Sequence, residues 1–187
     1  MGAALRVLDR ESQRWAVRRL VEHAAVEQEL TPGVAEEVAE WTGRIRLARD
    51  GVPAANVPSP REGVVPVRHV ADAEQPQNEL GAGESDGTVL AMLSTRTDTP
   101  VDQLRAGEAL SAVPLTATRY GLATDPVSQP LEVPTTRAEL RRSCLDGRGE
   151  PQLLLRLGWA PVSAVPVPRT GRLPVDQTID AMDAPWD

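Results

Sequence analysis

Proline placement limits how this chain can fold more than any other sequence feature, because proline ends helices and is excluded from central strands. The sequence has 17 prolines among 187 residues, nearly twice the usual share of about 5%. Most of them fall in two stretches, residues 48–87 and 160–187. We expect the first to be an irregular, lid-like loop over residues 51–87, lying over a site or on a partner, and the second to be an extended C-terminal arm. The predicted organisation is a folded module over residues 1–159 followed by that arm.

The N-terminal quarter of the chain carries the periodicities of one strand and two helices. Residues 3–8 are a short apolar run that predicts a strand, and residues 11–30 have apolar side chains at helical spacing. Thr31 followed by Pro32 predicts the cap and first position of a second helix, which Gly43 ends.

Regular structure resumes after the first proline-rich stretch. Residues 88–94 form an apolar run that is typical of a buried central strand. Thr99 and Pro100 predict the start of a helix that runs to Tyr120. Apolar residues wrap much of this helix, so we expect it to be buried, and Pro114 inside it predicts a kink.

The last regular segments predict one more helix and one more strand. Thr136 and Glu139 have the spacing of a capping box at a helix start, and residues 151–158 form an apolar strand. Strands that alternate with helices predict an α/β or α+β fold.

Composition excludes several kinds of chemistry. All 20 basic residues are arginines, so no lysine is present to bind a nucleotide phosphate in a P-loop or to form a Schiff base. The net charge of −7 and the pI near 5.0 argue against nucleic acid as a partner. With Cys144 as the single cysteine and only two histidines, neither an internal disulfide nor a Cys/His zinc cage can form. No segment is apolar over the length of a membrane span, and we expect a soluble, cytoplasmic protein without a membrane partner.

The short motifs carry little functional signal. Residues 81–83 are Gly-Ala-Gly, but a proline-rich stretch precedes them, which favours a turn over a dinucleotide site. We expect Cys144 to be a small buried apolar group and His23 to be a structural or surface residue. His69 lies in the lid-like stretch, where a structural role is again the simpler interpretation.

Three groups of polar residues leave alternatives open. Residues 95–99, Thr-Arg-Thr-Asp-Thr, follow the predicted central strand, where they would either contact a ligand or cap the next helix. The three arginines of the last predicted helix share one spacing and would face water or a partner's acids, namely Arg137, Arg141 and Arg142. Arg169 and Arg172 would either clamp a phosphate or be a plain solvated pair.

Seven stretches, taken together, resemble one family. They are EWTG at 40–43, DGVP at 50–53, LSTRTD at 93–98, LRAGEAL at 104–110, LTATRYGLA at 115–123, SQPLEVP at 128–134 and GEPQLLLRLG at 149–158. Their order resembles the C-terminal half of the Acg-type nitroreductase-like proteins of actinobacteria, and the last two stretches are the most specific.

The resemblance implies an α+β, nitroreductase-like fold, a mixed sheet wrapped by helices, in which FMN lies at the junction of two modules. It places the helix over residues 100–120 at that junction. It also implies that Ser128 and Gln129 approach the flavin ring and that Arg172, with Arg169, contacts the FMN phosphate. The arginine-bearing segment that begins such modules is not recognisable here, so the chain reads as an incomplete module.

The activity implied is NAD(P)H-dependent reduction of nitro compounds or quinones, by a homodimer or with a companion nitroreductase-like module. Two alternatives remain open, a non-catalytic module that binds or stores flavin and a structural half of a split protein that has lost flavin. The residues indicate no metal site and no individual catalytic residue.

Overall fold

The computed structural model describes residues 2–42, 49–57, 87–160 and 169–179. Most of the predicted lid-like stretch, including His69, lies outside these ranges. Within them, no helix has the length and apolarity that crossing a bilayer requires.

The core of the fold is a four-stranded sheet with the order β1-β2-β4-β3. Its strands are β1 (Ala3–Val7), β2 (Val89–Thr95), β3 (Ala123–Val127) and β4 (Glu150–Gly158). All three pairings are antiparallel, and a bulge interrupts the β2–β4 register between Leu93 and Ser94. The resemblance implied a mixed sheet, whereas the described strands contain no parallel pair.

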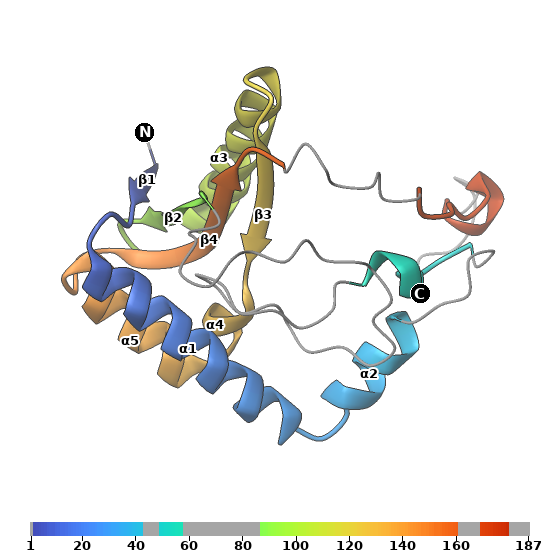
Figure 1. The fold of residues 1–187 in the computed structure, drawn as a ribbon, viewed down its shortest axis with the longest axis horizontal. Coiled ribbons are helices and arrows are strands. Elements are labelled where there is room, and N and C mark those ends of the chain that lie inside the picture. Colours follow the sequence, from blue (N-terminus) through green and yellow to red (C-terminus); the bar gives the residue numbers. More distant parts are fainter. Residues whose placement is uncertain (1, 43–48, 58–86, 161–168, 180–187) are drawn as a thin grey trace.

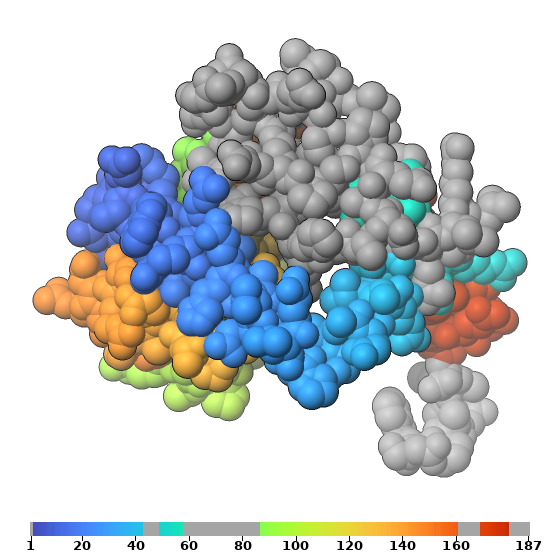
Figure 2. All heavy atoms as spheres, turned by 60° about the horizontal axis from the view of Figure 1, so that its bottom comes forward, coloured from blue at the N-terminus to red at the C-terminus, as the bar shows by residue number. Residues whose placement is uncertain are grey.

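Helices pack on the sheet from both sides (Figure 1). They are α1 (Glu11–Glu29), α2 (Val34–Trp41), α3 (Pro100–Arg119), α4 (Gln129–Glu132) and α5 (Pro134–Leu145), with short 3-10 turns η1 (Ala54–Asn56) and η2 (Val175–Gln177). The helices α1, α4 and α5 contact one another, and α3 contacts all four strands. Figure 2 shows α1 in blue lying directly against α5 in orange.

The main hydrophobic core lies between the sheet and the pair α1 and α5. It contains Leu8, Val17, Leu20, Val21, Leu90, Met92, Leu140, Cys144, Leu145 and Leu154. Side chains alternate between the faces of a strand, so the buried Ala91 and Leu93 point to the opposite face, which α3 covers in part. Cys144 is fully buried in this core, which confirms it as an apolar core residue, and burial raises the pKa of its thiol to about 11.

Five predicted elements are confirmed, namely β1, α1, β2, α3 and β4. The second helix begins later than predicted. Its N-cap is Gly33, in the left-handed region at φ 88°, while the Thr31 hydroxyl donates to the Glu27 carbonyl at 2.8 Å. Thr31 therefore belongs to the end of α1 and does not cap α2.

The predicted capping box at Thr136 is wrong. The helix α5 begins at Pro134, and Thr136 is a buried residue inside its first turn. Its hydroxyl donates to the carbonyls of Pro130 and Val133, at 2.7 and 3.0 Å. Glu139 instead accepts hydrogen bonds from Arg142 and Ser143.

The expectation that residues 100–120 form a buried helix is also wrong for the single chain. Within α3 only Asp102, Ala106 and Ala117 are buried. Val101, Leu104 and Leu115 are 56%, 68% and 69% exposed, and their spacing places them on one face of the helix. The helix therefore presents to its surroundings an apolar stripe that the exposed Glu108 and Ser111 interrupt.

Candidate functional site

A network of polar side chains joins the C-terminal end of β2 to the start of β4. The Gln152 amide nitrogen donates to Thr95 Oγ1 and to Asp98 Oδ1, at 2.9 Å each. Thr95 is 4% exposed, and its hydroxyl donates to the carbonyl of Thr97 at 2.7 Å. The side chains that follow the central strand are therefore fixed by their own chain.

Arg137 extends this network to α5. Its Nη1 lies 2.9 Å from Asp98 Oδ2, and its Nε and Nη2 donate to the Pro151 carbonyl at 3.3 and 3.2 Å. The hydrogen bond from Arg137 is the largest cause that lowers the pKa of Asp98 to about 2, and Gln152 contributes in the same direction. Asp98 is therefore a carboxylate at any pH near neutrality.

Thr99 caps α3, as its position predicted. Its Oγ1 accepts a hydrogen bond from the Asp102 backbone N–H at 3.2 Å. The Asp102 carboxylate accepts from the hydroxyls of Thr97 and Thr99, and these bonds lower its pKa. Of the two interpretations left open for residues 95–99, the structure supports capping and internal pairing.

The turn before β4 comes very close to the end of β2. Gly149 has φ +75°, and a Cβ atom there would lie 2.6 Å from the Thr95 carbonyl oxygen. Glycine supplies both the left-handed backbone and the missing side chain. This close approach holds the turn against the end of β2, and β4 begins at Glu150 directly after it.

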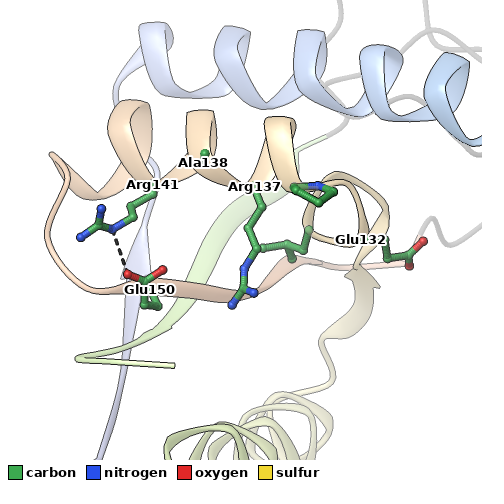
Figure 3. Close-up of a pocket in the computed structure, with 7 residues that line it drawn as sticks. Glu132, Arg137, Ala138, Arg141 and Glu150 are labelled. Carbon is green, nitrogen blue, oxygen red and sulfur yellow. Dashed lines mark ion pairs between the residues drawn. The ribbon is translucent and has the colours of Figure 1, made fainter. Parts of the chain in front are cut away.

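A groove of about 430 Å³ opens beside this network (Figure 3). Its lining residues are Leu131, Glu132, Pro134, Arg137, Ala138, Arg141 and Glu150. Figure 3 shows Arg141 with Glu150 at one end, Glu132 at the other and Arg137 between them. Arg141 Nε lies 3.0 Å from Glu150 Oε1 and donates to the Gly149 carbonyl at 2.9 Å.

The predicted flavin residues Ser128 and Gln129 lie at the start of α4, next to this groove. The Ser128 hydroxyl donates to Glu132 Oε1 at 2.6 Å. The Gln129 amide is mostly buried, at 7% exposed, and donates to Gln28 Oε1 at 3.0 Å. Both side chains make hydrogen bonds within their own chain.

The other predicted pair, Arg169 and Arg172, lies elsewhere. Both are exposed, and Arg172 Nη1 donates to Thr170 Oγ1 at 2.7 Å and to the Gly171 carbonyl at 2.8 Å. Figure 1 shows the red segment that carries them well apart from α4. A single copy therefore does not assemble these four residues into one flavin cradle.

Of the arginines of α5, Arg141 and Arg142 are exposed to water, as expected, whereas Arg137 is only partly exposed. Arg137, Arg141 and Arg142 pair with Asp98, Glu150 and Glu139 of the same chain. Glu139 lies three residues before Arg142 on the same helix, but Asp98 and Glu150 come from other segments and are not indicated by the sequence. Over the described ranges, no cluster of His, Cys, Asp and Glu could hold a metal ion.

Comparison with known proteins gives the family. A Mycobacterium tuberculosis protein named "Putative NAD(P)H nitroreductase" is 38% identical to the chain over 167 residues, 88% of this chain and 48% of that protein. A second protein of that organism, with the same name and the designation Acg, is 33% identical over 148 residues, 75% of this chain and 42% of that protein. The chain is a homologue of the Acg-type nitroreductase-like proteins. It spans about half the length of these relatives.

The fold comparison agrees with the sequence relationship. The structure of an iodotyrosine deiodinase with FMN and 3-iodo-L-tyrosine matches 98% of the chain and 77% of that protein, with a TM-score of 0.54 and 13% identity. At that identity the match concerns the fold alone, and it confirms the nitroreductase-like α+β architecture. No protein-family model matches the sequence.

Proposed function

We propose that this Acg-type homologue is an FMN-binding oxidoreductase that reduces nitro compounds or quinones with NAD(P)H. The observation that carries the proposal is the 38% identity over 88% of the chain to a protein named as an NAD(P)H nitroreductase. The fold supports it, because a solved protein that matches nearly the whole chain binds FMN.

The proposal includes a second module, from another copy of the chain or from a companion nitroreductase-like protein. The exposed stripe of Val101, Leu104 and Leu115 on α3 supports it. Exposed apolar side chains gathered on one helix face are typical of an interface. The separation of Ser128 and Gln129 from Arg169 and Arg172 supports it as well, because one copy offers only part of a flavin site.

Within that assembly Arg169 and Arg172 would hold the FMN phosphate, and Ser128 and Gln129 would lie near the ring. Arginine suits the first role because its guanidinium donates to two phosphate oxygens at once. Two further points remain predictions. One is the division of the chain into a module over residues 1–159 and an arm over residues 160–187, and the other is the cytoplasmic location.

The alternative is a module that binds or stores flavin without turnover, or a structural half of a split protein. The hydrogen bonds that Ser128, Gln129 and Arg172 make within their own chain favour this alternative. In the flavin-storing form, residues 51–87 would cover the flavin ring. Of these residues, only 51–57 and 87 lie within the described ranges.

One purification separates these functions. The chain is passed over a gel-filtration column after incubation with FMN, and visible absorbance and mass are read on the same peak. A coloured dimer that oxidises NAD(P)H in the presence of a nitroarene or quinone supports the proposal. A coloured peak without turnover supports the storage form, and a colourless peak at every mass refutes flavin binding by the chain alone.

The role of α3 is tested in the same run. Replacing Leu104 by arginine places a charge in the apolar stripe, and we expect the peak to shift to the monomer mass with loss of colour. Arg142→Gln, on the opposite side of the sheet, is the control. If the Leu104→Arg protein keeps both the dimer mass and the flavin, α3 is not the interface.

A further inference from the structure

The outward face of α1 carries side chains that the rest of the fold leaves exposed. The buried residues of α1 lie on the side that faces the core, among them Val17, Leu20 and Ala24. On the opposite side, Trp15 and Val26 are 62% and 55% exposed. Figure 2 shows α1, in blue, along the surface of the molecule. The sheet separates this face from α3, so the proposed module junction at α3 does not use it.

Two charged residues, Arg19 and Glu22, lie between Trp15 and Val26 on this face. The steps of four, three and four residues place the four side chains in one row along the helix, which we call the α1 row. The Arg19 guanidinium lies over the Trp15 ring, 5.1 Å from its centroid, and Glu22 pairs with Arg18 at 3.3 Å. Exposed contacts of this kind are weak, so Arg19 and Glu22 can still pair with another molecule.

The α1 row is self-complementary when a second copy is turned end for end. Trp15 and Val26 lie equally far on either side of the midpoint between residues 20 and 21, and so do Arg19 and Glu22. A two-fold axis at that midpoint places Trp15 opposite the partner's Val26 and Arg19 opposite the partner's Glu22, and each contact occurs twice. The midpoint is also close to the middle of α1, so the two helices would overlap along nearly their full length.

The charge of α1 changes sign along the helix, which favours the same arrangement. Residues 10–19 contain four arginines and one glutamate, whereas residues 20–29 contain three glutamates and no arginine. All eight of these side chains are exposed. An antiparallel pair sets each basic half against an acidic half, whereas a parallel pair would set like charges together.

Other kinds of partner fit this face less well. An anionic lipid surface would attract the basic half and Trp15, but it would repel the glutamates of the other half. An acidic protein surface would meet the same repulsion. A second copy of the chain satisfies both halves of the helix at once.

We propose that two copies of the chain associate through antiparallel α1 helices, with Trp15 against the partner's Val26 and Arg19 against the partner's Glu22. Each copy contributes one side of a helix of 19 residues, which is less than the roughly 20 to 30 residues per partner of a standard interface. The association is therefore weak and depends on protein concentration. It requires no flavin and is separate from the contact proposed for α3.

Sedimentation equilibrium of the full chain, without added flavin and at rising protein concentration, measures this association. We expect the average mass of the wild-type protein to increase with concentration. Arg19→Glu and Glu22→Arg each place like charges opposite one another twice, and we expect at least about ten-fold weaker association for either variant. Arg148→Glu is the matched control, because it changes the net charge as Arg19→Glu does but lies on the exposed turn between α5 and β4.

A mixture of the two charge variants gives the decisive measurement. In a mixed pair, one copy carries two acids in the α1 row and the other carries two bases, so both contacts again join opposite charges. We expect the mixture to associate about as tightly as wild type, although neither variant does so alone. Since none of these variants alters α3, any association through α3 contributes equally to every protein compared.

A wild-type mass that stays constant at all concentrations would refute the pairing. Unchanged association in both single variants would place any contact elsewhere, and a mixture that associates no better than the single variants would refute the antiparallel register. Equal weakening in the Arg148→Glu control would show a general charge effect and refute a specific contact. Circular dichroism of each variant confirms that it is folded before its mass is interpreted.

Discussion

Replacing Asp98 by asparagine tests whether the network at the end of β2 stabilises the fold. The variant keeps the shape of the side chain but removes the negative charge that faces Arg137 at 2.9 Å. The pKa of Asp98 is about 2, against an ordinary value of 3.8. A difference of about 2 pKa units corresponds to at most about 2.5 kcal/mol. Because the Asp98 side chain is 33% exposed, solvent screens the pair, and we expect a loss of about 1 kcal/mol in the free energy of unfolding at pH 7.

The pH dependence of this loss is the sharper measurement. The pKa of Asp98 is lower in the folded state, so its contribution is complete above the unfolded pKa of about 3.9 and disappears as the pH falls through about 2. Urea unfolding of both proteins between pH 7 and pH 2 should therefore give two stabilities that converge below about pH 4. Glu22→Gln, which removes an exposed i,i+4 pair with Arg18, is the control and should cost less than about 0.5 kcal/mol. A difference between wild type and Asp98→Asn that stays constant down to pH 2, or no difference at pH 7, would refute the reasoning.

Three single residues give further predictions. Gly149→Ala should lower the free energy of unfolding by about 1–3 kcal/mol in urea melts, because its Cβ would meet the Thr95 carbonyl oxygen at 2.6 Å in a left-handed backbone; a neutral result would mean that the turn relaxes. Cys144, fully buried and with its pKa raised to about 11, should react with a thiol reagent only as fast as the protein unfolds, and rapid labelling of the folded protein would contradict its place in the core. Arg172→Ala should weaken FMN retention by about 1.5–3 kcal/mol in a flavin titration if Arg172 bonds the phosphate, and an unchanged titration would remove it from the site.

Several elements can be predicted because their signal is local. Apolar runs and helical periodicities indicate β1, α1, β2, α3 and β4 from contiguous residues, and the fold contains each of them. Thr99 is a correctly predicted cap for the same reason, since its partner is the backbone N–H of Asp102 only three residues away. The family can also be recognised, because its motifs are contiguous stretches of sequence.

Other elements depend on contacts between distant parts of the chain. The strand β3 contains Pro126, which weakens its local signal, and it forms because β4 pairs with it at the sheet edge, where a proline is tolerated. The predicted start of α5 is misplaced because the Thr136 hydroxyl turns back to Pro130 and Val133 instead of capping. The apolar pattern of α3 is correct, but sequence alone cannot distinguish a buried helix from one that keeps an exposed apolar stripe.

The sequence alone determined the fold class, the lack of lysine chemistry and the relationship to the Acg-type proteins, because composition, periodicity and contiguous motifs need no knowledge of spatial neighbours. Only the tertiary structure decided which partners the arginines of α5 have. Arg137, Arg141 and Arg142 look equivalent along their helix, yet Asp98 and Pro151 occupy the first and Glu139 binds the third. The packing of α5 beside the start of β4 places Arg141 Nε 3.0 Å from Glu150 Oε1 and 2.9 Å from the Gly149 carbonyl. Glu139 lies on the same helix as Arg142, whereas Asp98, Pro151 and Glu150 come from segments that only folding brings beside α5.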